Sequence, residues 1–185
     1  MKACSFFGHR DTPQTEELKE KIRETVERLI VEKGVDTFLF GTRSSFDELC
    51  HIVVTELKEK YSNIRRIAYL CKHESGCLVG AGMKMKQQIK KLTGKDVYVP
   101  EYEDIKKSDR VNSAGRASYI ERNQFVIQDS DYCIFYFQMQ SLLSEKKFNK
   151  QKHNNKKKSG TKYAYEYALQ QKNRKKIIEI INLSQ

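Results

Sequence analysis

The residues best suited to bind an anion are Ser159, Gly160, Thr161 and Lys162, which follow the apolar run 132–137 and a polar loop. Because they come directly before a helix-like run rich in Tyr and Ala, they are predicted to form a helix N-terminus. Small residues there leave backbone N–H groups unpaired, and the helix dipole places its positive end beside them. This segment predicts a phosphate bound to the N–H groups of residues 160–162, although an ordinary helix cap uses the same residue types.

A second candidate contact follows the apolar run 3–7, where the chain reads Gly8, His9 and Arg10. A glycine lets a ligand approach the backbone closely, and an arginine can hold a phosphate by two hydrogen bonds. The alternative is a tight turn whose side chains are solvated.

A third candidate contact follows the run 37–40 and contains Gly41, Ser44 and Asp47. We expect a helix to begin at Ser44 or at Ser45, because Ser45 and Glu48 have the spacing of a capping box. A carboxylate in the first turn can accept hydrogen bonds from a ribose diol. Asp47 can equally be an acid that stabilises the helix dipole, so both roles stay open.

A fourth candidate contact lies within a helix predicted over residues 114–129 and contains Arg116, Tyr119, Arg122 and Asn123. Asn has no propensity advantage in the middle of a helix, which favours a side-chain role such as hydrogen bonding to a loop or a ligand. A solvent-facing helix surface is the alternative.

Catalytic groups are less well marked. Glu166, in the helix after Thr161, and Asp47 are the candidates for general acid or base chemistry, and the four histidines form no Ser/His/Asp arrangement. Cys71 and Cys77 flank His73 and Glu74, but their spacing matches no common zinc pattern, so we predict no metal site.

These residues need a scaffold that brings them together, and alternating elements provide one. Strand-like runs cover residues 3–7, 37–40, 66–70, 97–100, 132–137 and 176–182. Helical patterns follow most of them, including one that begins near Pro13 after a cap at Asp11 or Thr12 and ends at Gly34, and a basic one at 83–92. The pattern predicts an α/β fold: a single Rossmann-like three-layer domain over residues 1–185, with a mainly parallel sheet and helices on both faces. The turns with candidate contacts then meet at the carboxyl ends of the strands.

The net charge of +11 is concentrated in one segment, because residues 144–158 contain seven lysines and a single acid. We expect this basic loop to be mobile, and binding of single-stranded nucleic acid through it is an alternative function. Phe148 is the one aromatic residue in the loop, which disfavours a base-stacking platform. An odd number of cysteines and the absence of a signal-peptide pattern or a long apolar run favour a cytoplasmic protein without membrane contact. A homo-oligomer is compatible with the sequence.

The order of these motifs resembles the SLOG superfamily, the Rossmannoid proteins related to DprA and to Lonely-guy lysine decarboxylase-like proteins. The segments that carry the resemblance are Gly8-His9-Arg10, 41–47, 122–131 and 159–161, and they span most of the chain. The pattern is most similar to the YpsA-like bacterial branch. The resemblance implies a Rossmann-like domain that binds a nucleotide or a nucleotide derivative, with no assured cofactor. By motif it implies that the pocket residues include Gly8, Arg10, Gly41, Asp47, Arg122, Asn123, Gly160 and Thr161.

Two departures from the family pattern bear on activity. Relatives that cleave nucleoside monophosphates have a Gly-Gly-x-Gly-Thr-x-x-Glu pattern, whereas this chain has Ser159-Gly160-Thr161 with its glutamate at Glu166. In addition, Thr42 replaces the second glycine that accompanies Gly41 in the YpsA-like branch. We therefore expect a ligand sensor or regulatory module, with a phosphoribohydrolase-like nucleotide N-glycosidase as the alternative.

Overall fold

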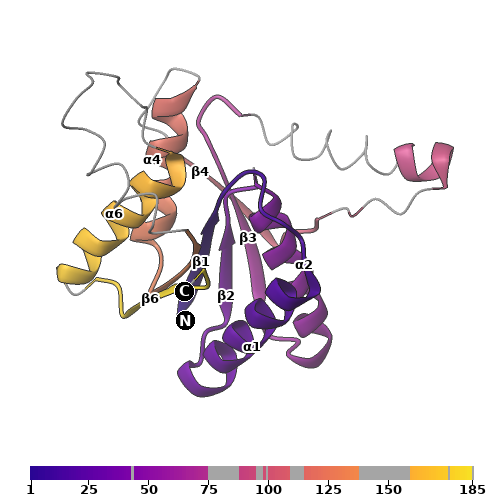
Figure 1. Cartoon of the computed structure of the whole chain (residues 1–185), viewed down its shortest axis with the longest axis horizontal. Helices are drawn as coiled ribbons and strands as arrows, with labels where there is room; N and C mark the ends of the chain where they lie inside the picture. Colours follow the sequence, from indigo (N-terminus) through magenta and orange to yellow (C-terminus); the bar gives the residue numbers. More distant parts are fainter. Residues whose placement is uncertain are drawn as a thin grey trace.

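The computed structural model describes residues 1–42, 44–74, 88–94, 98, 100–108, 115–137, 159–174 and 176–184. Within these ranges the chain forms a central sheet with helices on both faces, which confirms the predicted α/β fold (Figure 1).

The sheet has six strands, and every neighbouring pair is parallel. The strands are β1 (Ala3–Gly8), β2 (Thr37–Phe40), β3 (Arg65–Leu70), β4 (Asp104–Lys107), β5 (Tyr132–Tyr136) and β6 (Glu179–Asn182). Their order across the sheet is β4-β3-β2-β1-β5-β6. The chain therefore moves outward from β1 on one side and then returns to β1's other side through β5. Beside β1 lies a topological switch point, where open parallel sheets bind their ligands.

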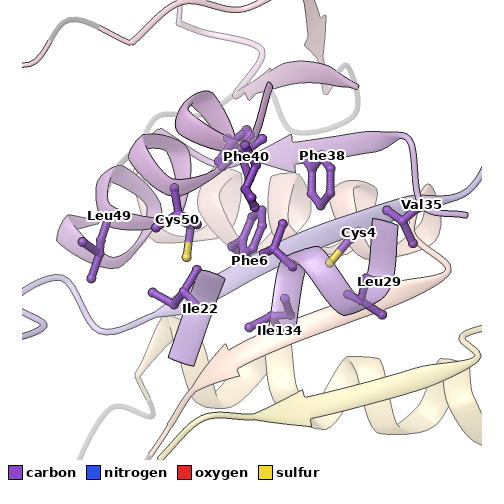
Figure 2. Close-up of a cluster of buried hydrophobic side chains, with 14 of the residues drawn as sticks. Cys4, Phe6, Ile22, Leu29, Val35, Phe38, Phe40, Leu49, Cys50 and Ile134 are labelled. Carbon is purple, nitrogen blue, oxygen red and sulfur yellow. The ribbon is translucent and has the colours of Figure 1, made fainter. Parts of the chain in front are cut away.

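Two helices cover each face of the sheet. Helices α1 (Glu16–Lys33) and α2 (Ser45–Lys60) pack on one face, and α4 (Arg116–Gln128) and α6 (Gly160–Asn173) pack on the other. The first core, beneath α1 and α2, contains Phe6, Phe38 and Phe40 (Figure 2). Phe7, the neighbour of Phe6, belongs to the second core, beneath α4 and α6. Since β1 is buried on both faces, its sequence is a continuous apolar run rather than an alternating one.

The start of α1 and the cap of α2 differ from the predictions, whereas α2 begins at Ser45, one of the two predicted residues. Helix α1 is capped by Thr15, whose hydroxyl accepts from the N–H of Leu18, so the prediction of a cap at Asp11 or Thr12 was wrong. Thr12 is instead held in the preceding loop, where its N–H donates to Ser45 Oγ. Helix α2 is capped by Ser44, because the Ser45 hydroxyl is already engaged by this loop. The predicted capping box at Ser45 and Glu48 is therefore not formed.

Strand β4 was missed by the sequence analysis, which predicted no strand between residues 100 and 132. Its sequence, Asp104-Ile105-Lys106-Lys107, is polar and largely exposed, since β4 lies at the edge of the sheet and needs no apolar face. Strand β6 is shorter than the predicted 176–182. Half of the predicted helix at 83–92 and half of the predicted strand at 97–100 lie outside the described residues, as does the whole basic loop 144–158. Residues 88–93 are helical.

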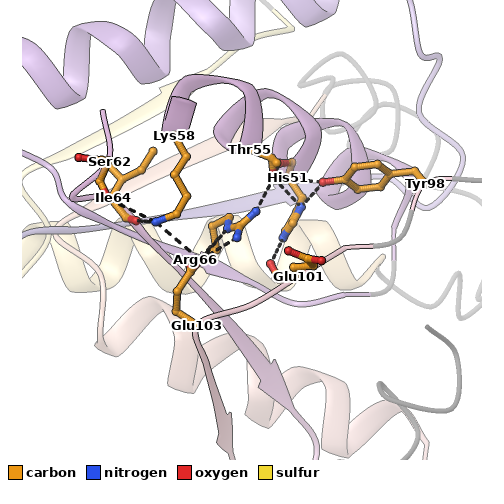
Figure 3. A network of polar contacts seen from close by, with 9 residues as sticks. All are labelled: His51, Thr55, Lys58, Ser62, Ile64, Arg66, Tyr98, Glu101 and Glu103. Carbon is orange, nitrogen blue, oxygen red and sulfur yellow. Dashed lines mark hydrogen bonds and ion pairs between the residues drawn. The ribbon is translucent and has the colours of Figure 1, made fainter. Parts of the chain in front are cut away.

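A buried polar network fixes α2 against the segment that leads into β4 (Figure 3). His51, which is 1% exposed, donates from Nε2 to the Glu101 carbonyl at 2.9 Å, and its Nδ1 lies 2.5 Å from the Tyr98 hydroxyl. In the neutral ring with its proton on Nε2, Nδ1 accepts a hydrogen bond from the tyrosine hydroxyl. Burial lowers the pKa of His51 to about 4. Arg66, beside it, forms a bidentate pair with Glu103.

Candidate functional site

One pocket lies at the carboxyl ends of β1 and β2, between the first turns of three helices. Its volume is about 660 Å³, within the range of small-molecule sites. The walls come from the turns after β1 and β2, from α4 and from the first turn of α6. This is the position that the switch-point rule gives for a ligand.

All the predicted contact residues line this pocket except Lys162. They are Gly8, His9, Arg10, Gly41, Ser44, Asp47, Arg116, Arg122, Asn123, Ser159, Gly160 and Thr161. Tyr119, which the sequence placed in the same group as Arg116 and Arg122, also lines it. The sequence analysis did not identify Phe6, Phe7, Asp11 and Ile120, which complete the lining. Ile120 follows Tyr119 on α4, and Asp11 follows Arg10, so both could have been found as chain neighbours of predicted contacts.

The turn after β1 is set by packing as much as by any ligand. A Cβ at Gly8 would lie 2.4 Å from the Phe46 side chain, so this glycine lets α2 pack against β1. The backbone of Arg10 is held by Ser45, whose N–H and hydroxyl both donate to the Arg10 carbonyl. Ser45 therefore positions the arginine at the pocket. The sequence analysis missed this role because it assigned Ser45 to a helix cap.

The turn after β2 joins Gly41, Asp47 and Arg122. The Gly41 N–H donates to Asp47 Oδ1 at 3.4 Å, and its carbonyl accepts from Arg122 Nη1 at 2.5 Å. A Cβ on Gly41 would lie 3.0 Å from Arg122 Nη2 and 3.3 Å from Asp47 Oδ2. The glycine thus makes room for a guanidinium and a carboxylate on the same side of the turn.

The Arg122 side chain is held in place by the protein at the pocket. It is 6% exposed, and its Nη2 donates to Asn123 Oδ1 at 2.9 Å. Within the described part of the chain its buried Nε has no hydrogen-bond partner. Its guanidinium also lies 5.4 Å from the Tyr119 ring. Arg122 therefore ties α4 to the turn after β2 and adds its positive charge at the pocket floor.

The first turn of α6 presents two backbone donors. Ser159 caps the helix, because its hydroxyl oxygen accepts from the N–H of Lys162. The sequence analysis had expected this N–H to bind a phosphate, but it is already bonded to the cap. The Thr161 hydroxyl donates to the Gly8 carbonyl at 2.9 Å and so ties α6 to β1. Among the described residues the N–H groups of Gly160 and Thr161 find no acceptor. A Cβ on Gly160 would meet nothing within 4 Å, which leaves open space beside these donors.

The two helices on this side of the pocket have an unusual charge at their starts. Helices α1 and α2 each carry two acids in the first turn, the usual partners of the helix dipole. The first turns of α4 and α6 carry none and contain Arg116 and Lys162 instead. The guanidinium of Arg116 lies 5.2 Å from the ring of Tyr163, in the first turn of α6, so the two helix starts are neighbours. A bound anion would supply the negative charge that both helices lack.

The candidate catalytic residues are not brought together. Glu166 does not line the pocket, whereas Asp47 does. The hydrolase alternative therefore depends on Asp47 without the second carboxylate that the sequence suggested. Within the described ranges no group of three or more His, Cys, Asp or Glu side chains is arranged to hold a metal ion, and Cys77 lies outside these ranges.

No helix in the described part of the chain is long and apolar enough to cross a membrane. No protein-family model matches this chain, and no curated protein sequence is significantly similar to it.

Proposed function

We propose that this protein binds a phosphorylated, nucleotide-derived ligand in the switch-point pocket and acts as a ligand sensor or regulatory module. The observation that carries the proposal is the convergence of predicted contacts from four separate segments of the chain on one pocket of ligand size. The sequence predicted phosphate and sugar contacts at residues that lie far apart in the chain, and nearly all of these residues line that pocket. The resemblance to the SLOG superfamily supports the same class of ligand.

The phosphate binds at the side of the pocket formed by α4 and α6. Two backbone N–H groups, at Gly160 and Thr161, point to this function because a phosphate oxygen is their natural acceptor. Arg116 adds a charge-assisted hydrogen bond, and the missing acids of the two helix starts favour an anion there. Arg10 lies in the turn after β1 and lines the same pocket.

The proposal places the protein in the cytoplasm, with a small molecule as its first partner. Nucleotides are abundant there, and the buried thiols of Cys4, Cys50 and Cys133 suit a reducing compartment.

A thermal-stability screen against nucleotides tests the proposal. Nucleoside mono-, di- and triphosphates and pyrophosphate-linked dinucleotides are added to the folded protein at millimolar concentration. A ligand at 100 times its Kd adds about 2.7 kcal/mol of stability and raises Tm accordingly. If no member of the panel raises Tm while the protein is folded, the proposal is wrong.

A pair of arginine variants locates the binding site. Arg116→Gln removes a pocket charge, whereas Arg65→Gln removes an exposed charge at the start of β3, at the opposite end of the strands from the pocket. We expect Arg116→Gln to weaken binding of the stabilising nucleotide about 10-fold or more and Arg65→Gln to leave it unchanged. Equal effects of the two variants would indicate general electrostatic attraction instead of a defined site.

A further inference from the structure

The pocket contains a carboxylate that a phosphate-binding site does not explain. Asp47 is 8% exposed and lines a pocket that also carries Arg10, Arg116 and Arg122. A carboxylate repels a phosphate, because both are negatively charged. Its position therefore points to a part of the ligand that is not the phosphate.

The dipole of α2 does not by itself require Asp47. Ser44 already caps the helix, and Glu48 supplies a second acid in the same first turn. What distinguishes Asp47 is its attachment to the turn after β2, where Oδ1 accepts from the Gly41 N–H and Oδ2 lies 3.3 Å from the missing Cβ of Gly41. The carboxylate is thus held in a fixed place on the pocket floor.

The two sides of the pocket differ in hydrogen-bonding character. The α6 side offers N–H donors from Gly160 and Thr161, which suit an anion. An ionised carboxylate such as Asp47 only accepts, so it suits a group that donates. A sugar with two neighbouring hydroxyls can donate two hydrogen bonds to such a carboxylate. A ligand that satisfies both sides carries an anion at one end and hydroxyl donors at the other.

We infer that the pocket recognises the ribose 5-phosphate unit of its ligand, with Asp47 accepting from the sugar hydroxyls, and that it selects ribonucleotides over 2′-deoxyribonucleotides. This inference rests on the proposed function, and it adds the sugar as the source of specificity. Hydrogen bonds to a charged group contribute enough to discriminate about 10- to 100-fold when the ligand lacks the hydroxyl.

The first experiment changes the ligand and leaves the protein as it is. Calorimetry measures the binding of ribose 5-phosphate, 2-deoxyribose 5-phosphate and inorganic phosphate, and of the common ribonucleoside 5′-monophosphates with their 2′-deoxy counterparts. We expect each ribose compound to bind about 10- to 100-fold more tightly than its deoxy partner. Equal affinity for the two sugars overturns the inference and leaves the proposed function intact. If neither the nucleotides nor ribose 5-phosphate bind, the proposed function itself fails.

The second experiment assigns the selectivity to Asp47. Asp47→Asn keeps the shape of the side chain and an oxygen for the Gly41 N–H, and Glu48→Gln is the matched change of the next acid in the same turn. We expect Asp47→Asn to bind ribose and deoxyribose compounds with similar affinity, and to bind inorganic phosphate at least as tightly as the wild type does because a repelling charge is removed. Glu48→Gln is expected to keep the full preference. An undiminished preference in a folded Asp47→Asn variant would overturn the assignment, and if that variant does not fold, the ligand comparison on the wild-type protein decides the inference.

Discussion

Two of the glycines at the pocket are needed for different physical reasons, which the structure distinguishes. Gly8 is required by the Phe46 side chain, whereas Gly160 borders open space beside two N–H groups that have no acceptor among the described residues. Both were predicted from sequence to let a ligand approach the backbone. The sequence could not distinguish them, because the contact between Gly8 and Phe46 joins residues far apart in the chain.

Alanine at these two positions is expected to have opposite consequences. Gly8→Ala places a methyl group against Phe46, so we expect a loss of about 1–3 kcal/mol in the free energy of unfolding. Gly160→Ala meets no protein atom and favours the helix, so stability should stay the same or rise slightly. Its added methyl group should instead weaken binding of the stabilising nucleotide. Chemical denaturation and calorimetry on both variants check these outcomes, and a large loss of stability in Gly160→Ala would contradict the open space beside it.

Nearly all the contact residues predicted from the sequence line one pocket, but the sequence left open which partner each side chain takes. Arg122 and Asn123 were expected to hydrogen-bond to a loop or a ligand, and Arg122 donates to the Gly41 carbonyl in the turn after β2 and to Asn123. The choice of residue types was sound, since buried arginines and turn glycines are the components of such sites. Which partner a side chain takes depends on the distance between α4 and the turn after β2, and no local pattern encodes that distance.

At the scale of the elements, the hydrogen bond from Arg122 to the Gly41 carbonyl joins α4 to the turn after β2. A single substitution at Arg122 is expected to lower the stability of the protein. Arg122→Met keeps the length of the side chain and removes its donors, which leaves the Gly41 carbonyl without its strong partner. We expect a loss of about 2–4 kcal/mol in the free energy of unfolding, because a buried polar group loses its hydrogen bond. Urea denaturation measures the loss. Arg28→Met, at a half-exposed ion pair with Glu179, is the control and should cost less than about 1 kcal/mol.

The attachment of α6 to β1 depends on the Thr161 hydroxyl. Thr161→Val is nearly isosteric and removes the donor to the Gly8 carbonyl. We expect a stability loss of about 1 kcal/mol and a weaker affinity for the stabilising nucleotide, because the first turn of α6 is no longer held at the pocket. Thr15→Val removes the cap of α1, which lies outside this pocket, and should lower stability by a similar amount without affecting affinity. Equal effects on affinity would show that Thr161 acts through global stability alone.

Elements were predictable where local chemistry decides them. Gly34 ends α1 at a φ of 68°, as its residue type indicates, and the apolar runs of β1, β2 and β5 mark strands buried on both faces. Strand β4 was missed because an exposed edge strand needs no apolar pattern and is specified by its pairing with β3. The start of α1 was misplaced because contacts between Ser45 and the loop before the helix decide where Thr12 lies.

For the whole molecule, the pH dependence of stability tests the buried network behind α2. The pKa of His51 is about 4 in the folded protein, lowered first by burial, while the ordinary value is 6.5. Below pH 6.5 the unfolded chain binds a proton at this histidine and the folded protein does not, so the free energy of unfolding falls as the pH falls. The loss develops between pH 6.5 and 4 and amounts to about 3 kcal/mol when complete. Above pH 6.5 both states are neutral, and His51 contributes no slope.

Comparing the wild type with His51→Gln separates the contribution of His51 to the pH dependence of stability from the contributions of the acidic residues. Glutamine keeps a donor and an acceptor near the Glu101 carbonyl and the Tyr98 hydroxyl but does not titrate. Glu56 and Glu103, whose pKa values are lowered by their ion pairs, act equally in both proteins and cancel in the difference. Urea denaturation of the two proteins from pH 7.5 to 5 should therefore show stability falling more steeply in the wild type, by up to about 1.4 kcal/mol per pH unit. Parallel curves would mean that the pKa of His51 is not lowered in the folded protein, so that its ring gains a proton there as readily as in the unfolded chain.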